Sequence, residues 1–184
     1  MHDPEDADVT FTTLTTAELT AAQQASIIEL CVAAHEMEGF RDLFALIRSG
    51  RHFLAHRASE LVSHAVVTTR RAQPEGLHEL QTAYVDAVST LPAYQGRGYG
   101  SAVMARLAAG IGDYEIACLQ TDRTGFYERL GWEVWRGPLA GRGERGLIPT
   151  PEQRGVMVLR LPTTPAIDLD TLLTIECQPE RIWE

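Results

Sequence analysis

The chain has 184 residues, of which 45% are hydrophobic and 22% are charged, and its formal net charge is −9. These proportions are typical of one globular domain with a sizeable hydrophobic core. The negative charge speaks against a nucleic-acid backbone as the main partner, because binding to phosphates needs clustered Lys and Arg. It suits a small cationic substrate, although solubility alone is the simpler explanation.

The apolar runs of the chain are too short to span a bilayer, which takes roughly 20 residues. The first eight residues are acidic and polar, so they lack the basic and apolar regions of a signal peptide. We therefore expect a cytoplasmic protein with no membrane partner.

The three cysteines, Cys31, Cys118 and Cys177, are far apart and show no Cys-x-x-Cys spacing. Reduced thiols are therefore expected, and a zinc site is not. The internal histidines also lack metal-like spacing, and we interpret them as surface or core residues: His35, His52, His56, His64 and His78. No metal is predicted.

The apolar pattern predicts a mixed α/β chain, with antiparallel strands first and a strand–loop–helix–strand unit after them. Strands are expected at residues 11–14, 53–57, 61–70, 77–91, 115–120, 132–135 and 156–161. Helices are expected from a cap at Thr16 to about residue 34, over 43–48, from the glycine-rich loop to about 109, and over 124–130. We expect residues 1–8, 137–153 and 162–184 to be tail or loop, and residues 1–184 to form a single domain.

The strongest local signal is a glycine-rich run that follows the most strand-like stretch and precedes a helix. Gly96, Gly98 and Gly100 fall within five residues. Glycine lets the backbone approach a ligand closely, and amides at the start of a helix point at an anion. A pyrophosphate site and a simple turn are both open here. A Rossmann fingerprint would need its third glycine one residue later, and a P-loop needs Gly-Lys-Ser/Thr.

Two motifs then carry a family resemblance. Gln95-x-x-Gly98-x-Gly100 resembles the Gln/Arg-x-x-Gly-x-Gly/Ala motif of Gcn5-related N-acetyltransferases, and residues 124–132 resemble their FYERLGF segment. The likeness covers about residues 61–161. It implies an α/β (α+β) fold with a central mixed, mostly antiparallel sheet of six to seven strands, splayed at the cofactor site and flanked by helices. Dimers are common in that family, which implies a homodimer as one option.

The resemblance also implies acetyl-CoA as the cofactor. Amides from the glycine loop would hold its pyrophosphate, and main-chain groups of the preceding strand would pair with the pantetheine arm like an added strand. A bulge in that strand would open the groove. The implied cofactor-binding residues are Ala87, Val88, Ser89, Gln95, Gly96, Arg97, Gly98, Tyr99, Gly100 and Ser101.

Acetyl transfer needs a base for the ammonium, a donor for the oxyanion and an acid for the leaving thiolate. Asp86 is the candidate base, since a carboxylate in an otherwise apolar strand is costly unless it is exposed or paired; alternation would place it on one face with Tyr84 and Val88. It could equally bind the cation or face solvent. Tyr127 is the candidate acid, because a phenol suits a departing thiolate, and its alternative is a core aromatic. The amide near Val88 is the candidate oxyanion donor.

A narrower resemblance is to aminoglycoside 2′-N-acetyltransferases. It rests on Tyr84-Val85-Asp86, on Trp132-x-x-Trp135-x-Gly137-Pro138, on Thr150-Pro151-Glu152 and on a tryptophan near the C-terminus. It implies that Asp86 stands in place of a catalytic glutamate. It also implies that Glu152 and Trp183 contact the amino sugar.

An acidic group in the loop after the first helix completes the expected acceptor site: Glu36, Glu38 and Asp42. Carboxylates suit a polycationic amino sugar, although a solvated loop explains them equally. The leading interpretation is therefore an aminoglycoside N-acetyltransferase that confers antibiotic resistance. An acetyltransferase for another small amine or a protein N-terminus, and a non-catalytic acyl-CoA sensor, stay open.

Overall fold

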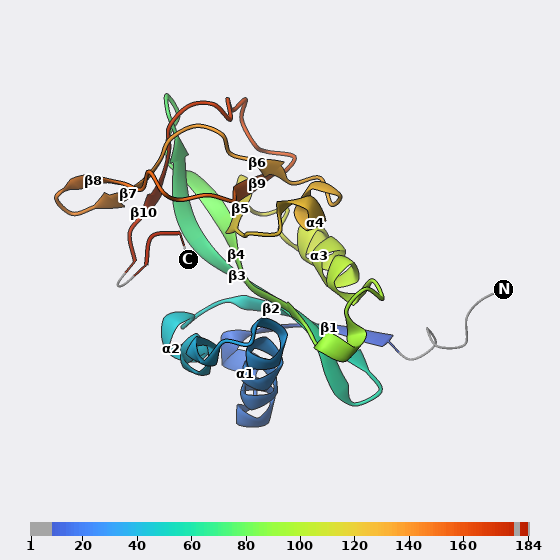
Figure 1. The fold of residues 1–184 in the computed structure, drawn as a ribbon. Helices are drawn as coiled ribbons and strands as arrows, with labels where there is room; N and C mark the ends of the chain where they lie inside the picture. The colour runs from blue at the N-terminus through green and yellow to red at the C-terminus, as the bar shows by residue number, and fades with distance from the viewer. Residues whose placement is uncertain (1–8, 179–180, 184) are drawn as a thin grey trace. The chain divides into compact units, whose positions relative to one another are not determined.

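The computed structural model describes residues 9–178 and 181–183, so the tail predicted at 1–8 and the last residue lie outside the described chain. The backbone contacts group into two compact units. The first comprises residues 9–68 with Val85–Gly110, and the second comprises Thr69–Tyr84 with the residues from Ile111 onward. Figure 1 shows the elements of both. The single-domain expectation stays a prediction.

The elements follow the predicted order closely. Strands are β1 Val9–Thr15, β2 Arg51–Arg57, β3 Glu60–Pro74, β4 Leu80–Thr90, β5 Ile116–Gln120, β6 Glu133–Val134, β7 Leu139–Gly143, β8 Gly146–Pro149, β9 Val156–Arg160 and β10 Leu173–Glu176. Helices are α1 Ala21–His35, α2 Leu43–Leu46, α3 Tyr99–Gly110 and α4 Thr124–Glu128, with 3-10 turns at η2 Thr16–Glu18, η3 Glu38–Asp42 and η4 Pro92–Tyr94.

The sheet is mixed and mostly antiparallel, which confirms the predicted fold class. Strands of the first unit run in the order β1-β2-β3-β4, and those of the second in the order β6-β9-β5-β4-β3-β10-β7-β8. The parallel pairs are β4 with β5 and β7 with β10. The described residues form ten strands, more than the six to seven expected.

The extra strands correct two loop predictions. Residues 137–153 contain the hairpin of β7 and β8, in which Gly143 pairs with Gly146 around a two-residue turn. Every residue of β8 is exposed, so no apolar alternation marked it as a strand. In the tail, Leu173–Glu176 forms β10, which pairs parallel to β7 and antiparallel to β3.

Strand β2 has helices on both of its faces within the first unit (Figure 1). Leu54 joins a core cluster with Ile27 and Leu30 of α1. The neighbouring residue, Phe53, faces the other way, and its ring lies 3.0 Å from where a Cβ on Gly110 of α3 would stand. Because successive strand residues point to opposite faces, α1 covers one face and α3 the other.

Helix α1 begins later than predicted, at a cap on Thr20. The Thr20 hydroxyl accepts a hydrogen bond from the Gln23 amide at 3.2 Å, and the Gln23 side chain accepts one from the Thr20 amide at 2.9 Å. This reciprocal pair needs Gln or Glu three residues after the cap. Thr16 starts only the short η2 turn, so the predicted cap at Thr16 was wrong.

Replacing Thr20 by Ala is expected to destabilise the protein by about 1 kcal/mol, because an orphan amide of the first turn loses its partner. The measurement is urea unfolding at neutral pH. Ser26→Ala is the matched control, since Ser26 is exposed inside the same helix and alanine is the better helix former there. Equal losses in the two variants would contradict the capping role.

All three cysteines are free thiols, in line with the prediction. Cys31 and Cys118 are fully buried, and Cys177 is half-buried. Burial raises the pKa of the Cys31 thiol to about 11, although a hydrogen bond from Ser89 lowers it slightly. The enclosed Cys31 sulfur is therefore not a nucleophile at neutral pH.

Candidate functional site

The glycine-rich loop has the backbone that a phosphate site requires. Gly96 and Gly98 have φ angles of 75° and 88°, a left-handed conformation that side chains other than glycine rarely adopt. A Cβ at either position would meet no atom within 4 Å, so an approaching group can reach the backbone there. Helix α3 starts at Tyr99, and its first hydrogen bond runs from the Ala102 amide to the Gly98 carbonyl at 2.9 Å. These features fit the diphosphate of coenzyme A.

The side chains around this loop fasten it and add positive charge. The Gln95 side-chain amide donates to the Thr90 carbonyl at 3.1 Å, which ties the loop to the end of β4. The Arg97 guanidinium lies 5.7 Å from the centre of the Tyr94 ring, and Arg57 lies 6.0 Å from it. The charge of Arg57 is offset by Glu60, which accepts a hydrogen bond from the Tyr94 hydroxyl at 2.6 Å, so Arg97 is the cation of this loop that favours an anionic ligand.

The strand before the loop contains a left-handed residue, Ala87, whose φ is 49°; the predicted bulge stays a prediction. The Ala87 carbonyl accepts a hydrogen bond from His64 Nδ1 at 3.0 Å. The Ser89 hydroxyl, whose one hydrogen is shared between this carbonyl at 3.3 Å and Cys31 Sγ at 3.4 Å, lies on the same oxygen. The left-handed residue interrupts the alternation that was expected to place Tyr84, Asp86 and Val88 on one face. Asp86 and Val88 are both half-buried.

Two histidines that carried no sequence signal reach this strand. His64 contacts Ala87, and the exposed His35 at the end of α1 lies 2.9 Å from the Ser89 hydroxyl. Ser89 is itself 2% exposed, so its side chain points into the protein. The partners lie 23 and 54 positions apart in the chain, and no local pattern could have joined them.

The predicted acidic group is only partly available to a cation. Glu38 forms an ion pair with Arg41 at 2.5 Å, and Arg41 also binds Glu29 at 2.8 Å. Glu36 ends α1 with a left-handed φ of 54° and is exposed, as is Asp42 before α2. All three carboxylates are exposed, and Glu36 and Asp42 are the stronger candidates for contact with an acceptor because Glu38 is engaged by Arg41.

Tyr127, in the short helix α4, has a phenol that keeps its proton. Burial raises its pKa to about 12; Arg123 lowers it, and Asp122 adds to the rise. Its ring packs edge-on against Phe126 and Trp132, with centroid distances of 4.9 and 6.1 Å. Among the residues that the structure describes, its hydroxyl has no hydrogen-bond partner, so the phenol is chemically able to donate a proton.

The two acceptor residues expected near the C-terminus lie in different surroundings. Glu152 is exposed. Trp183 is 1% exposed and belongs to the core cluster of the second unit. Its indole donates to the Thr150 hydroxyl at 3.1 Å, and its carbonyl accepts from the Tyr84 hydroxyl. This enclosure favours a packing role, because the side chain has almost no surface left for a sugar.

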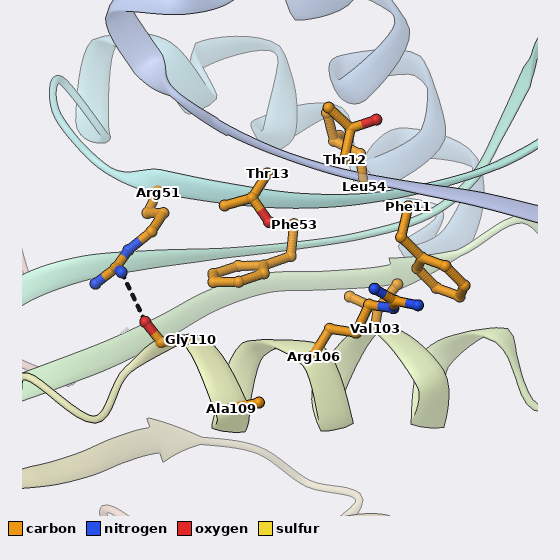
Figure 2. A pocket seen from close by; sticks show the side chains of 10 residues that line it. All are labelled: Phe11, Thr12, Thr13, Arg51, Phe53, Leu54, Val103, Arg106, Ala109 and Gly110. Atoms are coloured by element: carbon orange, nitrogen blue, oxygen red, sulfur yellow. Dashed lines mark hydrogen bonds between the residues drawn. The ribbon is translucent and has the colours of Figure 1, made fainter.

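A pocket of about 290 Å³ lies between β1, β2 and the second half of α3. Figure 2 shows Arg51 reaching the Gly110 carbonyl at one end and Arg106 beside Phe11 at the other. The two distances are 2.6 Å for that hydrogen bond and 4.1 Å from the Arg106 guanidinium to the ring centre. None of the predicted coenzyme or acceptor residues lines this pocket.

Two classes of site are not found in the described part of the chain. No group of three or more His, Cys, Asp or Glu side chains there could hold a metal ion. No helix within residues 9–178 and 181–183 combines the length and apolarity needed to cross a membrane.

Solved structures share this fold at low sequence identity. YhbS from Escherichia coli, determined in complex with CoA, matches with a TM-score of 0.67 and 12% identity over 100% of this chain and 99% of that one. Eis1 from Mycobacterium abscessus gives 0.61 and 19%, over 72% and 33% of the two chains. A Gcn5-related N-acetyltransferase from Kribbella flavida gives 0.57 and 20%, over 72% and 35%. The chain thus spans about a third of the last two proteins.

The sequence itself matches the family described as acetyltransferase (GNAT) domain over residues 15–135. That region includes the glycine-rich loop, the strand before it and α4, which are the parts described above. Because the match extends over more than half of the chain, the chain belongs to the acetyltransferase (GNAT) family.

Proposed function

We propose that the chain transfers the acetyl group of acetyl-CoA to an amine of an aminoglycoside, with the 2′-amine preferred, and so confers resistance in the cytoplasm. The observation that carries the transferase part is the pair of left-handed, unobstructed glycines at the start of α3. The amino-sugar part is supported by the Tyr84-Val85-Asp86 sequence and by the exposed carboxylates of Glu36 and Asp42.

The coenzyme supplies an acetyl thioester, which needs an anion site and an acid for its leaving group. The amides of Gly96–Ser101, with Arg97, hold the diphosphate. The backbone of Ala87–Ser89 would pair with the pantetheine arm, and because the Ala87 carbonyl is already bonded to His64, the contribution of this segment would centre on the Val88 amide. That amide is the oxyanion donor.

Two side chains move the protons. Asp86 accepts a proton from the incoming ammonium, through water if its shorter side chain cannot reach. The Tyr127 hydroxyl holds the proton that the departing sulfur takes, and burial keeps that hydroxyl protonated at neutral pH. General acid and base catalysis of this kind contributes typically about 10²- to 10⁴-fold to the rate.

A different acceptor, such as a polyamine or a peptide N-terminus, is the second candidate. It is favoured by the burial of Trp183 and by the ion pair of Glu38 with Arg41, because both remove contacts expected for a sugar. The same glycine loop and the same Tyr127 would serve that reaction.

The deciding experiment measures release of the CoA thiol from acetyl-CoA with a panel of amines. The panel contains aminoglycosides with a free 2′-amine, matched compounds without it, a polyamine and a short peptide. Turnover is expected only with the first group. Turnover confined to the polyamine or peptide would support the second candidate, and coenzyme binding without any turnover would point to a sensor.

Gly98→Ala is expected to weaken binding of coenzyme A about tenfold, because a Cβ would enter the space over the amides and the left-handed backbone would be strained by about 1–2 kcal/mol. Isothermal titration calorimetry with coenzyme A measures this effect. Gly112→Ala is the control, since its Cβ also meets no atom within 4 Å and it lies after α3. Unchanged affinity in Gly98→Ala would place the diphosphate elsewhere.

A further inference from the structure

A continuous row of hydrogen bonds crosses the interior of the first unit and ends on the irregular residue of β4. The Thr16 hydroxyl lies 2.9 Å from His52 Nε2, and His52 Nδ1 lies 3.0 Å from His64 Nε2. His64 Nδ1 then lies 3.0 Å from the Ala87 carbonyl oxygen. Both imidazole rings are 0% exposed, so these contacts are their whole polar environment among the described residues.

The chemistry of the last partner fixes the tautomers of both rings in this row, whereas the Thr16 hydroxyl also has the Gly50 carbonyl within reach at 3.3 Å. A carbonyl oxygen only accepts, so His64 must carry its hydrogen on Nδ1. A neutral ring then accepts at Nε2, which requires His52 to donate from Nδ1 and to accept from the Thr16 hydroxyl at Nε2. Both rings are neutral at pH 7, because burial lowers the pKa of His64 to about 3 and that of His52 to about 4.

Ala87, at the end of this row, needs contacts that keep its backbone left-handed. A left-handed backbone costs a residue other than glycine roughly 1–2 kcal/mol and persists where its surroundings enforce it. At Ala87 the enforcing contact is the hydrogen bond from His64, and the Ser89 hydroxyl lies farther away, at 3.3 Å, with Cys31 Sγ as its other acceptor. Two apolar side chains would fill the same space without holding that carbonyl.

A rigid peptide group links this contact to the reaction. The Ala87 carbonyl and the Val88 amide belong to one planar trans unit, in which C=O and N–H point in opposite directions. A carbonyl drawn inward to His64 therefore turns the Val88 N–H away from that ring.

We propose that His52 and His64 are positioning residues, which hold the peptide between Ala87 and Val88 so that the Val88 N–H faces the reacting acetyl group. This inference rests on the proposed function, in which that amide receives the acetyl oxygen. His64 acts through the Ala87 carbonyl, and His52 acts by holding His64 in the donor form.

Two isosteric substitutions separate positioning from packing. The side-chain NH₂ of asparagine stands near the place of Nδ1, whereas that of glutamine stands near the place of Nε2. His64→Asn is therefore expected to keep kcat within about threefold, because a donor to Ala87 is retained. His64→Gln is expected to lose at least about tenfold in kcat with little change in KM for acetyl-CoA, as for a weakened oxyanion donor.

The second readout needs no substrate. Nitrogen-15 shifts of the imidazole rings report their tautomers, and His64 is expected to show hydrogen on Nδ1 in the wild-type protein. This measurement uses the wild-type protein, so it remains valid even if His64→Gln fails to fold. Unfolding midpoints of His64→Asn and His64→Gln show whether each variant is folded.

Each contrary outcome has a distinct meaning. A hydrogen on His64 Nε2, or equal kcat in folded His64→Asn and His64→Gln, overturns the positioning role alone. Absence of coenzyme binding and turnover in the wild-type protein overturns the proposed function and the positioning role with it.

Discussion

Tyr127→Phe is expected to lower kcat about 100-fold at pH 7 and to leave KM for acetyl-CoA within about threefold, because only the proton donor is removed. The ring is kept, so its edge-on packing against Phe126 and Trp132 survives. The measurement is steady-state thiol release with the best amine of the panel. It is compared with Phe126→Leu, which alters the neighbouring ring and is expected to retain kcat.

The pH profile adds a second check on this acid. Because burial raises the pKa of Tyr127 to about 12, the phenol keeps its proton throughout the range in which most amines are assayed. Below pH 10 the wild-type rate is therefore expected to show no decline caused by loss of the Tyr127 proton. Any alkaline decline in that range is expected to persist in Tyr127→Phe. An unchanged kcat in Tyr127→Phe would remove the phenol from the mechanism and leave it as a core aromatic.

Acidification from pH 7 to pH 5 is expected to destabilise the folded protein by on the order of 3 kcal/mol through His52 and His64. Burial lowers their pKa values to about 4 and about 3, from 6.5. Between pH 6.5 and pH 4 the unfolded chain therefore binds more protons than the folded one. The stability these rings contribute is complete above pH 6.5 and is lost as the pH falls.

Urea unfolding at pH 7, 6 and 5 measures this loss. The carboxylates of Glu18, Glu115 and Asp170, whose pKa values are lowered by hydrogen bonds, contribute mainly below pH 4.5 and do not disturb this window. The double variant His52→Asn/His64→Asn carries no titrating ring at either position and is expected to lose far less stability. Parallel pH dependences in the two proteins would contradict the assignment.

Local sequence signals predicted the elements whose own residues favour the structure that they adopt. The long run before the glycine loop is rich in residues that favour strands, and it forms β4 with its bounds shifted by three residues or fewer. The glycine loop and the helix after it were predicted from three glycines that follow a strand, and the structure gives Gly96 and Gly98 the left-handed backbone that favours glycine. The family motifs then supplied the topology, which periodicity alone does not determine.

Features that depend on distant partners escaped prediction. Strand β8 is exposed, and β10 is held by pairing with β7 and β3 rather than by its own pattern. Trp183 was expected to contact the amino sugar, yet it is buried, donates a hydrogen bond to Thr150 and accepts one from Tyr84. The row from Thr16 to Ala87 joins four separate segments of the chain. Such contacts form only when the chain is folded.

The enclosed sulfurs have a practical consequence for the assays above that follow thiol release. Thiol release is followed with a disulfide reagent, which attacks thiolates that it can reach. Cys31 and Cys118 are out of its reach in the folded enzyme, so these two thiols react with it only when the interior opens to solvent. In the absence of substrate, the rate at which the reagent modifies Cys31 therefore measures how often the first unit opens. The rate for Cys118 measures the same for the second unit.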